Sequence, residues 1–205
     1  MLKKLTLLAM SVGALLAIAA PAAQATGPLI TDSDGNTPTY ITAVSNNFTI
    51  HTVGNRLECT TFDLTLHLTQ NALTTVKGHG GGHATGTRPA GLHSGHCGAA
   101  SGLIVEFTNV TVNDIHLTKH GGATTGTATF TFTFHLRTGP TPGSLIAECT
   151  LGGTVPVVKT ESNDVNATGK ITKTGGSAFC PTEGELTSDF ELFNHGSYVD
   201  AATIH

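Results

Sequence analysis

Tryptophan is absent from this 205-residue sequence, and tyrosine and charged residues are scarce. Aromatic residues make up 5% of the chain and charged residues 12%, whereas charged residues form about a quarter of an average soluble domain. Carbohydrate-binding modules and platforms for single-stranded nucleic acid usually present several exposed rings for stacking. The shortage of rings therefore disfavours both functions. The formal net charge of −4 disfavours binding to nucleic-acid phosphates or anionic lipid.

The sequence also lacks the motifs of several common catalytic sites. The segment 94–98 resembles the one that carries the general base in bacterial chymotrypsin-like proteases, but no Gly-Asp-Ser-Gly-Gly string supplies a nucleophile. No Gly-x-Ser-x-Gly, His-Glu-x-x-His or phosphate-binding glycine motif occurs. We therefore expect a non-catalytic protein. A hydrolase with two Asp or Glu carboxylates is the weaker alternative, because any two strands of a fold can bring such groups together.

The first 25 residues have the features of a secretory signal peptide. Lys3 and Lys4 precede an uncharged apolar stretch over 5–19, and residues 23–25 form a small-x-small cleavage site. No later apolar run reaches the roughly 18 residues of a membrane-spanning helix. We expect a signal peptide at 1–25, a flexible lead-in at 26–38 and one all-β domain at 39–205. The expected location is the extracellular or cell-envelope space.

The four cysteines are expected to form two disulfides, because exported chains are oxidised. Three pairings are possible among Cys59, Cys97, Cys149 and Cys180. The tripeptide Glu-Cys-Thr occurs at 58–60 and again at 148–150, and another cysteine follows each copy at a comparable distance. This repeat favours Cys59–Cys97 and Cys149–Cys180, one bridge in each half of a duplicated β unit. The alternative is that so short a repeat is a coincidence.

Large apolar and polar residues alternate along the middle of the chain. In 62–68 and 130–136 every second residue is Phe or Leu, and the residues between them are Thr, Asp or His. A period of two places all apolar side chains on one face of an extended strand. The same alternation begins at Leu103, shifts phase near Asn109 and shifts again before Ile115. Such phase shifts are typical of a β-bulge or a turn.

Turn-forming pairs separate these alternating runs, among them Gly54-Asn55, Gly121-Gly122 and Gly175-Gly176. About ten strands at this spacing, without a convincing helical stretch, predict an all-β fold. The expected architecture is an antiparallel β-sandwich or barrel with one buried face. Alternation does not distinguish the two, because it contains no information on strand order.

The signal peptide, the Thr- and Gly-rich alternating strands and the repeated Cys-Thr strand together resemble uncharacterised exported β proteins of high-GC bacteria. The resemblance spans most of the chain after residue 25. It implies an all-β fold with disulfides and an exported location. It implies no site residues, because that group has no established activity.

Eleven histidines make this residue type unusually frequent. Four lie in the Gly-rich segment 77–97, where His79 and His83 are four apart and His93 and His96 are three apart. Imidazoles at such spacings can share a Zn²⁺ or Cu²⁺ ion. The segment 79–96 is therefore expected to be a His-rich loop that binds metal, or else a mobile surface loop that merely contains histidine. The glycines at 80–82 favour the second interpretation, because ordering a flexible loop around an ion costs conformational entropy.

A second set of histidines lies on the polar faces of expected strands. Its members are His51, His67, His116 and His135. If two of these strands are neighbours, cross-strand imidazoles would lie about 5 Å apart and could chelate an ion. Otherwise the four belong to a solvated Thr- and His-rich surface.

One further segment has a metal-like spacing of oxygen ligands. Asp32, Asp34 and Asn36 alternate as they do in a calcium loop, but the glycine and glutamate positions of an EF-hand are not matched. A polar lead-in explains this segment better.

The sequence therefore favours a secreted structural or binding module without a cofactor. Its expected partner is a protein surface or a small apolar ligand held between the sheets, and nucleic acid is not expected. A metal-binding protein that uses the loop 79–96 is the alternative. A ligand-binding barrel requires an apolar cavity of a few hundred Å³, and the metal site requires imidazole nitrogens that converge to within about 4 Å.

Overall fold

The computed structural model describes residues 27–84, 97–99, 102–138, 143–194 and 201–205, and no helix occurs in these ranges. The signal peptide predicted at 1–25, together with His93 and His96, lies outside the described residues. The strands are β1 (Ile30–Thr31), β2 (Tyr40–Ser45), β3 (Phe48–Thr52), β4 (Asn55–Cys59), β5 (Phe62–Ala72), β6 (Thr75–Ala84), β7 (Cys97–Ala99), β8 (Ile104–His120), β9 (Ala123–Arg137), β10 (Leu145–Lys159), β11 (Asp164–Gly176), β12 (Glu183–Asn194) and β13 (Thr203–Ile204).

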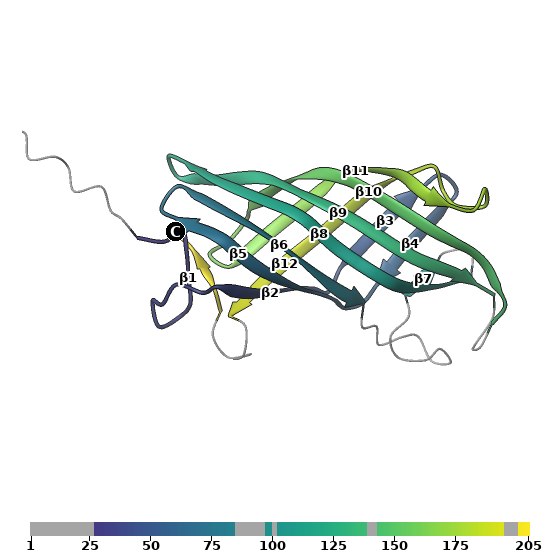
Figure 1. Ribbon diagram of the computed structural model, residues 1–205, viewed down its shortest axis with the longest axis horizontal. Coiled ribbons are helices and arrows are strands. Elements are labelled where there is room, and N and C mark those ends of the chain that lie inside the picture. The colour runs from purple at the N-terminus through teal and green to yellow at the C-terminus, as the bar shows by residue number, and fades with distance from the viewer. Residues whose placement is uncertain (1–26, 85–96, 100–101, 139–142, 195–200) are drawn as a thin grey trace, which may run out of the picture.

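The main sheet closes on itself as a barrel-like ring (Figure 1). Its strands follow the order β11-β10-β9-β8-β6-β5-β2-β12, and β12 pairs again with β11, which completes a ring of eight strands. All of these pairings are antiparallel. The all-β antiparallel fold predicted from the sequence is therefore confirmed. The pairing of β12 with β11 closes the ring. The alternation in the sequence did not indicate this strand order.

Three positions of the ring are each built from two short strands. β12 pairs with β2 through 191–194 and with β3 through 184–187. β8 pairs with β6 over 110–118 and with β7 at 104–105. The ring is therefore completed by β2, β5 and β6 towards one end of the barrel and by β3, β4 and β7 towards the other. The chain passes through the eight positions in sequence order.

The alternation sorts side chains between the interior and the outer surface. In β9, Phe130, Phe132 and Phe134 are buried, and the threonines between them are partly exposed. Phe48 and Phe62 stack in the interior with ring centroids 4.0 Å apart, and Phe132 contacts both rings edge-on. Eight strands enclose an interior just wide enough for side chains to fill. The barrel is therefore stabilised by the packing of its own apolar residues.

Strand β8 contains the two irregularities that its phase shifts indicated. Its register against β9 shifts between Phe107 and Asn109 and again between Val112 and Asp114. An extra residue at each bulge returns the following apolar side chains to the interior face. The phase shifts are thus bulges within one 17-residue strand, and not turns.

The Gly-rich segment expected to begin a mobile loop instead forms a strand. Residues 75–84 are β6, which lies between β5 and β8, so His79 and His83 are strand residues. A Cβ atom on Gly80 would lie 2.0 Å from the carbonyl oxygen of Thr65 in β5. Glycine in a strand often marks a close approach of another backbone. The glycines therefore allow two strands to approach closely, and they do not create a flexible loop.

Residues 27–38, the described part of the segment expected as a flexible lead-in at 26–38, are also part of the fold. β1 pairs with β13 in a separate two-stranded sheet, which we call the clasp. Leu29 and Ile30 are fully buried, and the side chain of Asn71 exchanges two hydrogen bonds with the backbone of Ile30. Asn71 precedes the β5–β6 turn, so the clasp covers that end of the barrel (Figure 1). The polar residues of this segment had suggested that it is mobile. Burial of Leu29 and Ile30 instead holds it against the barrel.

Candidate functional site

Two disulfides lie at the barrel end opposite the clasp, which we call the disulfide end. Cys59 is bonded to Cys97 and Cys149 to Cys180, the pairs that the repeated tripeptide favoured. The chain passes through eight ring positions, four in each half of the barrel. The first copy of the repeat lies at the second position of the first half, which β4 and β5 form. The second copy lies in β10, which is the second position of the second half. Two buried disulfides indicate an oxidising environment.

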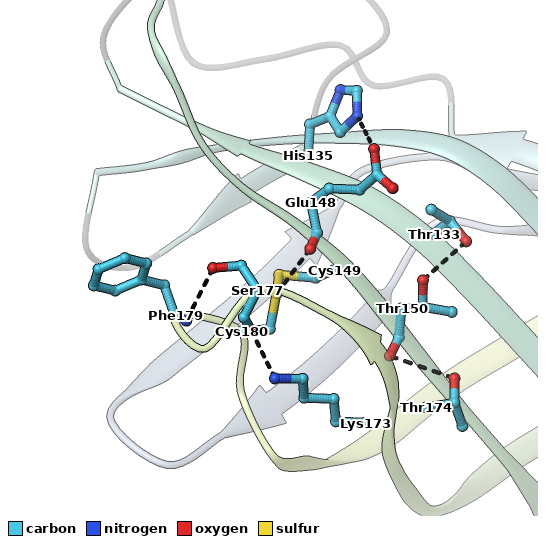
Figure 2. The surroundings of a disulfide bond; sticks show 10 residues. All are labelled: Thr133, His135, Glu148, Cys149, Thr150, Lys173, Thr174, Ser177, Phe179 and Cys180. Atoms are coloured by element: carbon cyan, nitrogen blue, oxygen red, sulfur yellow. Dashed lines mark hydrogen bonds and ion pairs between the residues drawn. A yellow bond between two sulfur atoms is a disulfide. The ribbon is translucent and has the colours of Figure 1, made fainter.

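The Cys149–Cys180 disulfide fastens the β11–β12 loop to β10 (Figure 2). The backbone N–H of Ser177 donates to the carbonyl oxygen of Glu148 at 3.0 Å. The backbone N–H of Phe179 donates to the hydroxyl of Ser177 at 3.3 Å. The ring of Phe179 points away from these contacts and is 77% exposed. The loop therefore holds an exposed aromatic side chain on a constrained backbone.

Phe179 borders a hollow at the disulfide end that has both polar and apolar lining. The hollow has a volume of about 270 Å³ and is lined by Thr52, Val53, Gly54, Asn55, Leu57, Leu103, Phe134, Leu136, Phe179 and Pro181. Val53, at the β3–β4 turn, is 92% exposed, and the start of β10 exposes Leu145 and Ile146 at the same end. Four of the six large apolar side chains that are exposed in the described residues thus lie at this end of the barrel, and Val53 and Phe179 line the hollow itself.

A row of charged side chains crosses β8, β9 and β10 near the disulfide end. Glu106, His135 and Glu148 are register partners. The Nε2 atom of His135 lies 3.1 Å from Glu148 Oε2, and its Nδ1 atom lies 3.5 Å from Glu106 Oε2. Arg137 Nε donates to Glu106 at 2.8 Å. Because the two carboxylates contact opposite ring nitrogens, the three groups do not converge on one ion, and the row forms a polar margin of the disulfide end.

The first predicted histidine set is only partly described. Positions 79 and 83 are four residues apart in β6, which separates them by about 13 Å along the strand. One ion does not bridge that distance. No group of three His, Cys, Asp or Glu side chains that could hold a metal occurs in the described part of the chain. A metal site that includes His93 and His96 remains a prediction.

The second histidine set is distributed over four strands. His51 lies in β3, His67 in β5, His116 in β8 and His135 in β9. None is a register partner of another member. His51 is opposite Arg56 and Glu185, and His116 is opposite Lys77. No two members of this set therefore form the cross-strand pair that chelation within the set would require, even where their strands are neighbours.

One histidine pair, which the sequence pattern does not reveal, joins the two sets. His67 and His79 are cross-strand partners on β5 and β6 with ring centroids 5.4 Å apart. The turn between β5 and β6 pairs Ala72 with Thr75, and a register shift after Leu68 then brings His79 opposite His67. The segment that contains His79 had been expected to be a loop, and without the shift His67 would face the next residue, Gly80. Register alone decides this contact.

The barrel interior leaves little space for a ligand. Its cavity is about 30 Å³ and is lined by apolar side chains such as Ile30, Leu66 and Phe130. That volume suits a water-sized guest, whereas ligand sites usually measure about 300–1,000 Å³. The small apolar ligand expected between the sheets does not fit this cavity.

The carboxylate of Asp32 is occupied by hydrogen-bond donors. It accepts hydrogen bonds from the backbone N–H groups of Asp34 and Asn36, and from the side-chain amides of Asn36 and Asn194, at 2.7–3.2 Å. Burial raises the pKa of this carboxyl, but the hydrogen bonds outweigh burial and hold its pKa below the usual value. N–H groups around an anion leave no place for calcium, so this segment is a structural turn.

Carboxylates also border a hollow of about 410 Å³ on the outer surface, where Glu183 and Glu185 lie near His51. Glu183 is ion-paired with Lys170 at 2.5 Å, and the side chains are 48% and 65% exposed. The hydrolase alternative with two carboxylates remains a prediction.

No helix in the described residues is long and apolar enough to cross a membrane. No family model, curated protein or solved structure matches this chain.

Proposed function

We propose that this protein is an exported, non-catalytic binding module that recognises an apolar segment of a protein partner through its disulfide end. The exposure of Val53, Leu145, Ile146 and Phe179 at that end carries the proposal, and two of them, Val53 and Phe179, line one hollow. Exposed apolar side chains bordered by polar ones are typical of protein–protein contact sites. Here the rim is the row of charged side chains across β8, β9 and β10.

The constrained loops support this function. Phe179 lies one residue before Cys180, whose disulfide fixes the loop to β10. A preorganised loop loses little conformational entropy on binding. Aromatic side chains held near the centre of an interface commonly dominate its binding energy.

A protein segment fits this end better than a small molecule does. The hollow of about 270 Å³ is below the usual range of about 300–1,000 Å³ for ligand pockets, and the interior cavity is about tenfold smaller still. One apolar side chain can occupy such a hollow while the neighbouring residues of its chain contact Val53 and Phe179 around it.

Export is supported by two independent features. The two disulfides indicate an oxidising compartment. The first 25 residues have the charge and apolar pattern of a signal peptide.

The test is selection of a random peptide library on the oxidised protein, followed by calorimetry with the selected peptides. We expect apolar peptides, whose affinity falls at least about tenfold in a Val53→Ser/Phe179→Ser variant, because these exposed side chains provide the contact. The matched control is Tyr40→Ser/Val158→Ser, which removes the two exposed apolar side chains that lie elsewhere. Equal loss in both variants, retention in both, or selection of no apolar peptide would each contradict the proposal.

A further inference from the structure

We propose that His67 and His79 form a binding site for Cu²⁺ on the outer surface of β5 and β6. The site lies away from the disulfide end and does not depend on the function proposed for that end. It combines one histidine from each of the two sets that the sequence separated.

The geometry of the pair suits a shared ion. His67 and His79 are directly opposite each other in an antiparallel ladder, and their ring centroids are 5.4 Å apart. Side chains in such positions have Cβ atoms about 4.5–5.5 Å apart. Two imidazole nitrogens that each lie about 2.0–2.1 Å from one ion are compatible with this ring separation.

The rings require only a local rotation to chelate. Their planes are now at 85°, with the edge of one ring towards the other. His79 is exposed and His67 partly exposed. Rotation about the last side-chain torsion of histidine is a soft motion. The backbone, which fixes the spacing of the two residues, does not need to move.

The surroundings distinguish this pair from the other histidines of the second set. His51 lies between Arg56 and Glu185, and His116 is opposite Lys77, so neither has an imidazole opposite it. His135 is engaged by two glutamates. In contrast, the bulge of β8 places Asp114, an exposed acid, in the stretch opposite His79.

The ligand set indicates copper. Imidazole nitrogen suits Cu²⁺, Ni²⁺ and Zn²⁺, and divalent affinities peak at Cu²⁺. Two nitrogen donors with water in the remaining positions match the tetragonal N,O coordination that Cu²⁺ prefers. Zn²⁺ sites usually need three or four protein ligands, and the described residues contain no group of three.

The test is titration of the full oxidised chain with Cu²⁺ alone. In NMR spectra the paramagnetic ion should first broaden the ring signals of His67, His79 and Tyr40, because the Tyr40 ring stacks on His67 at 4.7 Å. Electron paramagnetic resonance should show two nitrogen donors. His67→Gln or His79→Gln should each lower the Cu²⁺ affinity at least about tenfold, since loss of a group that merely supports a metal ligand already costs that much.

Two controls locate the ion. His51→Gln removes an exposed strand histidine that has no imidazole opposite it and should leave the affinity unchanged. A His93→Gln/His96→Gln variant tests the remaining histidines of the first set and should retain the site. Broadening that begins elsewhere, a signal from one nitrogen, loss of binding in the His93/His96 variant or unchanged binding in His79→Gln would each overturn the proposal. The NMR result on the unmodified chain decides the matter even if a variant fails to fold.

Discussion

Single glycines in β6 determine how closely this strand approaches β5. An added Cβ would lie 2.0 Å from the Thr65 carbonyl oxygen at Gly80 and 1.9 Å from the Asp63 carbonyl oxygen at Gly82. In the sequence the same glycines predicted a flexible loop. Glycine is common both in flexible loops and where two strands approach closely, so its presence alone does not distinguish the two. The structural role depends on a neighbour that the local sequence does not identify.

Replacement of Gly80 by alanine is expected to destabilise the protein by about 1–3 kcal/mol or more, because the methyl group forces the two backbones apart. Gly122→Ala is the matched control, since a Cβ there meets no atom within 4 Å. The control should be neutral or slightly stabilising. Denaturant unfolding of both variants measures the difference. Equal stability of the two would contradict a steric limit at Gly80.

At the scale of elements, the clasp contains a two-residue strand, β1, which is held in place by contacts with residues far away in the sequence. β1 and β13 lie near opposite ends of the described chain, yet Leu29, Ile30 and Ile204 are all buried. The Asp32 turn extends this contact to β12, because Asn194 donates to the Asp32 carboxylate. Two apolar residues give too short a pattern to predict a strand, so the sequence indicated only a lead-in.

The Asp32 turn predicts an acid-dependent loss of stability. The pKa of Asp32 is lower in the folded chain than its ordinary value of about 3.9, so the ionised form stabilises the fold. That contribution is fully present above the ordinary pKa and is lost as the pH falls through the lower folded pKa. Melting temperatures of the natural chain and of Asp32→Asn should therefore differ most near neutral pH and converge in strong acid. A difference that is independent of pH would contradict this role.

For the whole molecule, closure of the ring is the main feature. β12 pairs with β11 on one side and with β2 and β3 on the other. An open sandwich would leave free edge strands whose backbone groups face solvent. In the closed ring the first and last strand positions are joined directly, so neither is an edge.

Hydrogen exchange tests the closure. The amides of β12 that pair with β2 and β3 should exchange as slowly as those at the centre of the β8–β9 pair, because each requires broad unfolding to open. Mass spectrometry or NMR resolves these segments. Rapid exchange confined to β2, β3 and β12 would indicate an edge at this position and would contradict the closed ring.

The sequence by itself determined the all-β class, the buried face of the long alternating strands and the places where the alternation of β8 shifts, although it left open whether each shift is a bulge or a turn. These features depend on the alternation of apolar and polar residues with a period of two. This alternation is local, so the sequence alone indicates which side chains are buried. The repeat around Glu58 and Glu148 also favoured the two disulfide pairs that the structure contains.

Only the tertiary structure decided the ring closure, the clasp, the pairing of His67 with His79 and the location of exposed apolar residues at the disulfide end. In each of these features, strand order or register decides which residues lie next to one another. A register shift of one residue would place Gly80, and not His79, opposite His67. Such contacts are selected by the combined packing of the barrel, which no segment encodes alone.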